Sequence, residues 1–327
     1  MLFLYNIAIR CYYCAIWLAS FFNDKARLWI EGRRHNFQQL KSFQPAPGCK
    51  VVWLHAASLG EFEQGRPLLE AIKKQQPATQ IILSFFSPSG YQIRKDYELA
   101  DHVCYLPLDT ATNAKAFVAA VQPDIAIFVK YEFWYHHLHA LRSAGVRTFL
   151  VAGIFRKGQL FFKPYGGLFR NILHCFDVLL VQDDSSAQLL SKRLALPALV
   201  AGDPRVDRVL DIGASGRRFP KLEEFKGDSK VLIIGSSWPA DEQLLARLFQ
   251  EAAFAKWKFV LAPHEIGETH LRAIEKQFEP CVRYTQAGVK DLAKARILLV
   301  DTIGMLSSLY TYGNMAYIGG GFGAGIH

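Results

Sequence analysis

Residues 51–63 read VVWLHAASLGEFE, and this stretch decides the fold. Its first six residues form an apolar run of strand length, and the small residues and Gly60 that follow suit a tight turn. Glu61 then opens a stretch with helical spacing, where a carboxylate is favoured by the helix dipole. Strand, turn and helix in this order start a βα unit. Glu61 is either only a first-turn residue or a functional group at the end of the first strand.

Strand-like runs recur on the C-terminal side of this unit, separated by segments compatible with helices. They lie at 81–85, 102–106, 125–129, 148–152, 178–182 and 198–201. After a charged, turn-rich break over 207–230, further runs follow at 231–234, 259–262, 297–300 and 316–318, with helices from about 239, near 268–277 and near 303–312. This alternation predicts an α/β protein with parallel sheets covered by helices on both faces.

The length of 327 residues suggests about two domains, and 51% hydrophobic residues supply material for packed cores. We predict a membrane-associated helix with a basic flank over 1–36 and a Rossmann-like domain over 37–207. A linker is predicted over 208–229, and a second Rossmann-like domain over 230–327.

The first 22 residues are almost wholly apolar, with Arg10 as their only charge. A cleavable signal peptide would carry its charge before the apolar run. A spanning helix would place Arg10 near the middle of the bilayer, at a cost of roughly 2.5–3.5 kcal/mol. We therefore predict a membrane-associated helix, monotopic or shallowly inserted, followed by basic residues that suit anionic headgroups. The alternative is a helix buried in the globular domain.

The net charge of +9 and the pI of about 9.2 point to acidic partners, unless they serve only solubility. Nucleic acid, anionic lipid and phosphorylated substrates all fit, but no nucleic-acid motif is present. The six cysteines are irregularly spaced, and Cys11-x-x-Cys14 lies in the apolar N-terminal stretch, so we expect neither disulfides nor a zinc site. No histidine motif predicts a metal site.

Polar residues follow several strands of the first half, where ligands of parallel sheets bind. Lys130 and Glu132 follow the fourth strand and are either residues of a cleft or a surface ion pair. Arg156 and Lys163 follow the fifth strand, among aromatic residues. Cations interleaved with aromatics suit a phosphorylated, acylated acceptor, and they would also suit single-stranded nucleic acid.

The strands of the second half end in small and polar residues. Ser236 and Ser237 precede Pro239, which marks a helix start whose free N–H groups can hold a phosphate. Pro263 and His264 follow the next strand. The last strand leads into a glycine-rich loop that fits close approach to a nucleotide but lacks the pattern of a P-loop NTPase.

Together these motifs resemble the Kdo transferase family, which moves 3-deoxy-D-manno-octulosonic acid (Kdo) from its CMP-activated form to a lipid A precursor. The resemblance runs along the whole chain. Its most specific pieces are WLHAASLGE (53–61), YEFW (131–134), GDPRVD (202–207), GSS (235–237), DTIG (301–304) with Tyr310, and GGGFGAGIH (319–327).

The resemblance implies an inverting transferase of the GT-B fold, with two Rossmann-like domains facing across a cleft. Glu61 would be the catalytic base, without metal or cofactor. Residues implied on the acceptor side or in support are Ser58, Gly60, Lys130, Glu132, Arg156 and Lys163. Residues implied at the donor are Ser236, Ser237, Pro263, His264, Thr302, Gly304, Gly320, Gly321, Gly323 and Gly325. The implied partners are CMP-Kdo, a phosphorylated and acylated lipid A precursor and an anionic membrane surface, not nucleic acid, at the cytoplasmic face of the inner membrane.

The chain departs from the family pattern at several points. Lys130 stands where many members have the first acid of Glu-Thr-Glu, His264 where many have Arg, and Met305 where many have Glu. The family also continues beyond the position of His327, so the C-terminal part is expected to be truncated. Two alternatives stay open: another GT-B enzyme that uses a UDP-sugar, either a lipid glycosyltransferase or an epimerase, and a catalytically silent, membrane-bound module that binds a sugar nucleotide.

Overall fold

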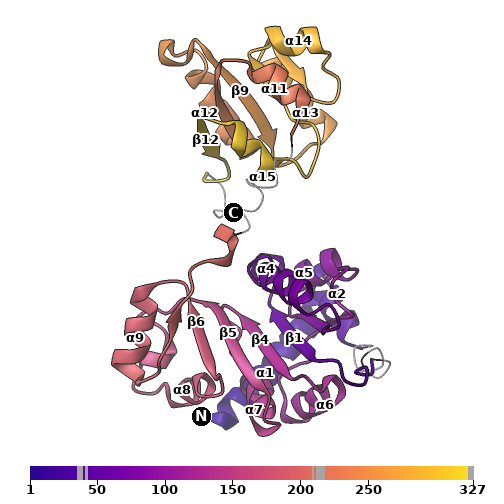
Figure 1. Cartoon of the computed structure of the whole chain (residues 1–327), viewed down its shortest axis with the longest axis vertical. Helices are drawn as coiled ribbons and strands as arrows, with labels where there is room; N and C mark the ends of the chain where they lie inside the picture. Colours follow the sequence, from indigo (N-terminus) through magenta and orange to yellow (C-terminus); the bar gives the residue numbers. More distant parts are fainter. Residues whose placement is uncertain (35–39, 41–42, 208–209, 211–217, 323–327) are drawn as a thin grey trace. The chain divides into compact units, whose positions relative to one another are not determined.

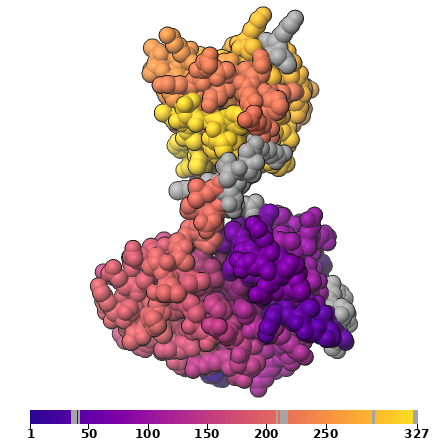
Figure 2. All heavy atoms as spheres, in the orientation of Figure 1, coloured from indigo at the N-terminus to yellow at the C-terminus, as the bar shows by residue number. Residues whose placement is uncertain are grey.

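The computed structural model describes residues 1–34, 40, 43–207, 210 and 218–322, except for the side chains of 289 and 290. The chain divides into two compact units, 1–207 and 208–327 (Figure 1). Each unit has a parallel sheet and hydrophobic cores of its own, and its atoms form a continuous body (Figure 2).

The sheet of the first unit has seven parallel strands in the order β3-β2-β1-β4-β5-β6-β7. The strands are β1 Val51–Ala56, β2 Gln80–Phe85, β3 His102–Tyr105, β4 Ile125–Val129, β5 Arg147–Gly153, β6 Val178–Val181 and β7 Leu199–Val200. All seven strands predicted for this half are confirmed. Each is an apolar run because both faces of a parallel sheet are buried.

Helices cover both faces of this sheet. They are α1 Leu2–Ala19, α2 Asp24–Arg34, α4 Leu59–Gln75, α5 Pro88–Arg94, α6 Ala111–Val121, α7 Tyr135–Ser143, η1 Leu160–Phe162, α8 Gly167–Leu173 and α9 Asp184–Leu194. Because side chains alternate along a strand, Leu54 packs into one core with Phe62 of α4, and Trp53 packs into the other with Phe117 of α6. Figure 1 shows α4 and α5 on the opposite side of the sheet from α6 and α7.

The strand order places a topological switch point between β1 and β4. The chain runs from β1 outward to β2 and β3, then returns to add β4 on the other side of β1. Loops diverge at such a point, and the crevice they leave at the carboxyl ends of the strands is where ligands of this architecture bind. The residues that follow β1 and β4 are therefore the first to inspect.

The second unit repeats the plan with five parallel strands in the order β10-β11-β9-β8-β12. The strands are β8 Lys230–Ser237, β9 Trp257–Pro263, β10 Cys281–Arg283, β11 Ile297–Leu299 and β12 Met315–Ile318. The helices are α11 Pro220–Lys226, α12 Pro239–Leu248, η2 Ala252–Phe254, α13 Glu268–Gln277, α14 Val289–Lys294, α15 Leu306–Leu309 and η3 Tyr310–Tyr312. The switch point lies between β8 and β12.

The linker predicted over 208–229 needs a correction. Residues 208–209 and 211–217 lie outside the described residues. Residues 220–226 form α11, because Leu222 and Phe225 are buried in a core of the second unit. The C-terminal part of the predicted linker is therefore a packed element of that unit.

The N-terminal helix α1 packs against the first unit along one stripe. Ile9 is buried, Tyr5 and Asn6 are partly buried, and most of the other large side chains of α1 are exposed. In the described part of the chain, α1 is the helix whose length and composition would allow it to cross a membrane.

Candidate active site

Glu61 lies at the carboxyl end of β1, in the first turn of α4. Its side chain is partly exposed, and the hydroxyl of Ser58 donates a hydrogen bond to its carboxylate. Gly60, which the sequence also places in the site, is exposed beside it. A carboxylate that reaches solvent at the switch point can accept a proton from a group that binds there.

Glu132 follows β4 and is buried. Two side chains contact the same oxygen of its carboxylate. Its Oε2 lies 2.8 Å from Nε2 of His55 and accepts a hydrogen bond of 2.7 Å from Nε1 of Trp134. His55 is fully buried in β1, and its Nδ1 lies 2.9 Å from Oγ of Ser84 in β2. Glu132 therefore holds the ends of β1 and β4 together, in contrast to the accessible Glu61.

The sequence prediction missed His55, Ser84 and Trp134 as members of this network. His55 and Trp134 stand in the motifs that carry the family resemblance, but nothing in the local spacing pairs them with Glu132. The pairing follows from the register in which β1 lies between β2 and β4.

Two residues at neighbouring strand ends have left-handed backbone conformations. Lys130 has φ of 68° just after β4, and Ala152 has φ of 57° near the end of β5. Such conformations cost non-glycine residues of order 1–3 kcal/mol and cluster at functional sites. The Nζ atom of Lys130 lies 5.7 Å from the ring centre of Tyr131, so the cation stays at this end of the sheet.

A cationic pocket of about 510 Å³ lies between the loop after β5 and helix α9. Its lining residues are Phe155, Arg156, Lys157, Ser185, Gln188, Leu189, Lys192 and Arg193. Within the described ranges, none of its four cations forms an ion pair with a carboxylate. Arg156 was predicted as a site residue; Lys192 and Arg193 were not, because on α9 they look like ordinary basic residues of a last helical turn. Lys163 is partly exposed beyond η1 and does not line this pocket.

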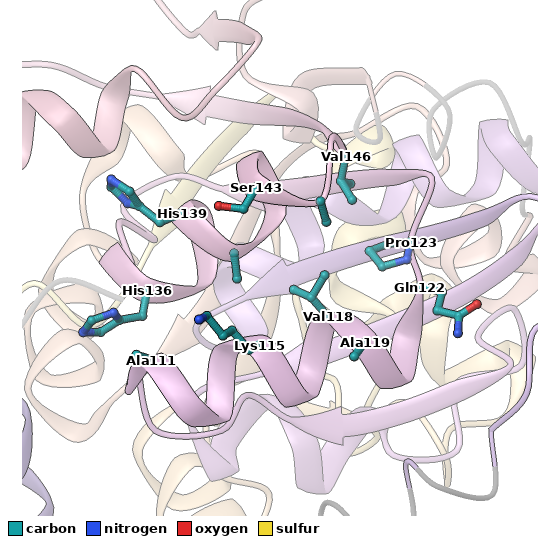
Figure 3. A pocket seen from close by; sticks show the side chains of 12 residues that line it. Ala111, Lys115, Val118, Ala119, Gln122, Pro123, His136, His139, Ser143 and Val146 are labelled. Carbon is teal, nitrogen blue, oxygen red and sulfur yellow. The ribbon is translucent and has the colours of Figure 1, made fainter.

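A groove of about 660 Å³ lies between α6 and α7 (Figure 3). Lys115 of α6 and His136 and His139 of α7 line it among alanine and valine side chains. Nε2 of His136 lies 2.6 Å from Oδ1 of Asn6, so one end of the groove is tied to α1. The groove runs along the two helices, and its lining contains no residue predicted for the site.

In the second unit, the ends of β8 and β12 meet around Asp241. Oδ2 of Asp241 accepts hydrogen bonds from the backbone N–H groups of Trp238 (2.9 Å) and Gly320 (3.0 Å), and Oδ1 accepts one from the hydroxyl of Tyr317 (2.7 Å). Burial opposes ionisation of Asp241, but these three bonds outweigh it and lower the pKa of the carboxyl. Gly319 fits only because it has no side chain, since a Cβ would lie 2.5 Å from the backbone oxygen of Ser236.

The phosphate site predicted at the start of α12 stays a prediction. Asp241 accepts the N–H group of Trp238, the N-cap residue of α12, which leaves one fewer N–H group there for a ligand. Ser237 is buried and donates to Oε1 of Glu242 at 2.9 Å, so its hydroxyl is used within the protein. Ser236 stays partly exposed, with φ of 53°.

The other predicted donor residues lie along the same edge of the second sheet. His264 is exposed and stacks on Trp238 with 4.5 Å between ring centres, while Pro263 is buried. Thr302 and Gly304 follow β11, and Gly320 and Gly321 follow β12. Gly323 and Gly325 lie outside the described residues. The fold therefore gathers the described members of the set at the carboxyl ends of β8, β9, β11 and β12.

Among the residues that the structure describes, no three His, Cys, Asp or Glu side chains gather into a group that could hold a metal ion. The candidate site consists of carboxylates, cations, backbone amides and aromatic rings.

Comparison with known proteins places this geometry in a family. Residues 31–208 match the family model described as 3-Deoxy-D-manno-octulosonic-acid transferase (kdotransferase). The chain is 25% identical over 318 residues to the 3-deoxy-D-manno-octulosonic acid transferase of Chlamydia trachomatis serovar D, covering 94% of this chain and 72% of that protein. It is 24% identical over 296 residues to the enzyme of the same name from Aquifex aeolicus, covering 88% and 75%.

Solved structures with a similar fold include two epimerases. The chain matches a UDP-GlcNAc 2-epimerase from Neisseria meningitidis with a TM-score of 0.54 at 14% identity, covering 82% of this chain and 77% of that chain. It matches a putative UDP-N-acetylglucosamine 2-epimerase from Listeria monocytogenes with a TM-score of 0.55 at 12% identity, covering 84% and 75%. At these identities the likeness shows the fold alone, which is the α/β GT-B fold.

The family model covers more than half of the chain, and named relatives match most of its length. With its two parallel α/β units and Glu61 at the first switch point, the chain belongs to the 3-deoxy-D-manno-octulosonic-acid transferase (kdotransferase) family of glycosyltransferases.

Proposed function

We propose that this protein is an inverting transferase that moves Kdo from CMP-Kdo to a lipid A precursor in the biosynthesis of lipopolysaccharide. The observation that carries the proposal is the accessible carboxylate of Glu61 at the β1/β4 switch point of a chain in this family. Of the two carboxylates at these strand ends, Glu61 is the one whose surroundings leave it open to a ligand.

The reaction needs one base. The carboxylate of Glu61 takes the proton of an acceptor hydroxyl as its oxygen forms a bond to the anomeric carbon of Kdo. The bond from that carbon to the phosphate oxygen breaks, and CMP leaves with the electron pair. Because the attack and the departure occur on opposite faces of the sugar, the configuration inverts without a covalent intermediate between sugar and enzyme.

The acceptor and the membrane location belong to the same proposal. The four cations beside β5 and α9 suit a phosphorylated acceptor, and the exposed apolar side chains of α1 suit contact with the cytoplasmic face of the inner membrane. The donor would bind at the strand ends of the second unit, where Ser236, His264 and Gly321 remain accessible.

The first prediction tests the base. Glu61→Gln keeps the shape of the side chain but removes its ability to accept a proton, so we expect transfer to fall by roughly 10²–10⁴-fold with an unchanged melting temperature. Transfer is measured as release of CMP from CMP-Kdo with an acylated lipid A precursor. Glu70→Gln, further along α4 and exposed, is the matched control and should behave like the parent.

Two results would contradict the proposal. Transfer by Glu61→Gln within a fewfold of the parent excludes this residue as the base. If the parent releases no CMP but turns over UDP-N-acetylglucosamine, the donor assignment is wrong.

A further inference from the structure

An apolar pocket of about 490 Å³ lies where α1 meets the loops that follow β4 and β5. Its lining residues are Tyr5, Ile9, Tyr131, Phe133, Trp134, Gly158, Gln159, Leu160, Phe161 and Phe169. Tyr5 and Ile9 come from α1, Tyr131 to Trp134 from the chain beside Glu132, and the others from the η1 and α8 region. One wall of the pocket is therefore the N-terminal helix, and another belongs to the candidate active site.

Two partly buried hydrogen bonds hold the helix wall in place. The hydroxyl of Tyr5 donates to Asp109 at 2.5 Å, and Asp109 is almost fully buried. Asn6 contacts His136 at the start of α7. Because these bonds join residues more than a hundred positions apart, α1 has a defined place on the first unit, and Tyr5 and Ile9 on its inward face line the pocket.

The polar atoms of the lining are largely engaged within the protein. The Tyr5 hydroxyl donates to Asp109, and Nε1 of Trp134 donates to Glu132. Oε1 of Gln159 accepts from the backbone N–H of Arg156 at 3.0 Å. A sugar ring needs partners for its hydroxyls, and this pocket offers few. It offers aromatic and aliphatic surface, which favours a hydrocarbon chain.

The cationic residues next to the pocket indicate which kind of molecule binds there. The loop that lines the pocket from Gly158 onward continues directly from Arg156 and Lys157, which line the cationic pocket. On the outer side of α1, Phe3 is 74% and Leu4 61% exposed. An apolar pocket, a neighbouring group of cations and an exposed apolar helix together fit an anionic amphiphile.

We infer that this pocket holds one hydrocarbon chain of the acceptor, and that α1 is a wall of the acceptor site as well as a contact with the membrane. The inference rests on the proposed function in taking the acceptor as an acylated phosphosugar. It assigns Ile9 and Leu160 as residues that select for the chain.

A binding experiment tests the pocket without any transfer reaction. The full-length protein is titrated by calorimetry with dodecyl phosphate, below its micelle concentration, and with butyl phosphate, which has the same headgroup. Ile9→Trp fills the pocket from α1, and Leu160→Trp fills it from the exposed opposite wall. Ile7→Trp, on the exposed side of α1, is the matched control.

The parent and Ile7→Trp should bind dodecyl phosphate at least about tenfold more tightly than butyl phosphate, and both filling variants should lose most of that difference. If both pocket-filling variants fold and keep the full difference in affinity between dodecyl and butyl phosphate, the inference is overturned. If only Ile7→Trp loses it, the chain binds the outer face of α1, which also overturns the inference.

A kinetic arm separates the inference from the proposed function. With CMP-Kdo as donor, Ile9→Trp and Leu160→Trp should raise the KM for the acylated acceptor and leave transfer to the deacylated disaccharide phosphate unchanged. An equal loss of transfer with both acceptors would contradict a pocket that binds a hydrocarbon chain. Failure of the parent to transfer Kdo at all would contradict the proposed function, while the measured binding of dodecyl phosphate would still test the pocket.

Discussion

Glu61 and Glu132 follow neighbouring strands, yet their surroundings give them different roles. Glu61 is partly exposed and bonded by Ser58, so it can exchange a proton with a ligand. Glu132 is 8% exposed and bonded by His55 and Trp134. Removing Glu132 would leave buried polar atoms without partners, which is a cost in stability of about 1–3 kcal/mol.

The second prediction concerns Gly319 at the end of β12. In Gly319→Ala the new Cβ would lie 2.5 Å from the Ser236 carbonyl oxygen and 2.7 Å from the Cα of Ser237. Both are backbone atoms, which cannot rotate away as the end of a flexible side chain can. We expect the second unit to lose about 1–3 kcal/mol of stability, and its affinity for CMP-Kdo to fall. Gly321→Ala, where a Cβ meets nothing within 4 Å, is the control. Denaturant unfolding followed by circular dichroism distinguishes the two, and equal stability would contradict the close contact.

At the residue scale, the sequence located the strand ends but not the side-chain pairs between them. Lys130, Glu132 and Arg156 could be named because polar residues directly follow apolar runs. His55 and Glu132 are 77 positions apart in the chain, and their pairing depends on β1 and β4 being neighbours in the sheet. The hydrogen bonds that Asp241 accepts from Tyr317 and Gly320 were likewise not predictable, because these two residues lie on a distant segment of the chain.

At the scale of elements, apolar runs of strand length were sufficient to predict the sheets, since parallel strands are buried on both faces. β10 was missed because it has only three residues and ends at Arg283, whose guanidinium is bonded by Glu268 and Glu275. α11 was missed because two buried side chains in seven residues give too weak a period to recognise.

The third prediction concerns the outer face of α1 and the exposed turn that follows the helix. The triple variant Phe3→Ser, Leu4→Ser and Phe22→Ser removes side chains that are 74%, 61% and 94% exposed. These side chains contribute little to the core, so the melting temperature should stay close to that of the parent. Sedimentation with anionic vesicles should fall severalfold. Full retention on vesicles would show that this face is not the membrane contact.

The fourth prediction concerns the acid sensitivity of the docked helix. Burial opposes the charge on Asp109, but hydrogen bonds from His137, Tyr5 and the backbone N–H of His136 hold the pKa of the carboxyl below its ordinary value of 3.8. Because the pKa is lowered on folding, the stabilisation is fully present above pH 3.8 and is lost as the pH falls through the lower value of the folded state.

The measurement is hydrogen exchange of α1 amides between pH 5 and 3, corrected for the intrinsic exchange rate. Protection of α1 should fall at the acid end, and Asp109→Asn should show reduced protection already at pH 5. Equal protection in the parent and in this variant would contradict docking through Asp109.

At the scale of the whole molecule, the two units have separate cores. The fifth prediction is that residues 1–207 form a folded fragment, because the sheet and both cores of the first unit are built from this segment alone. The fragment should unfold in one cooperative transition and should retain binding of dodecyl phosphate. A fragment without a cooperative transition would show that the first unit needs residues beyond 207.

The bond between Tyr5 and Asp109 has a consequence for synthesis in the cell. The two residues are 104 positions apart, and a ribosome adds roughly 5–20 residues per second. Helix α1 therefore leaves the ribosome on the order of ten seconds before the carboxylate that docks it. During this interval its inward apolar stripe is as open as its outer face. If α1 binds the membrane as proposed, a membrane surface near the ribosome meets the helix first, and the domain then folds onto a helix that is already in place.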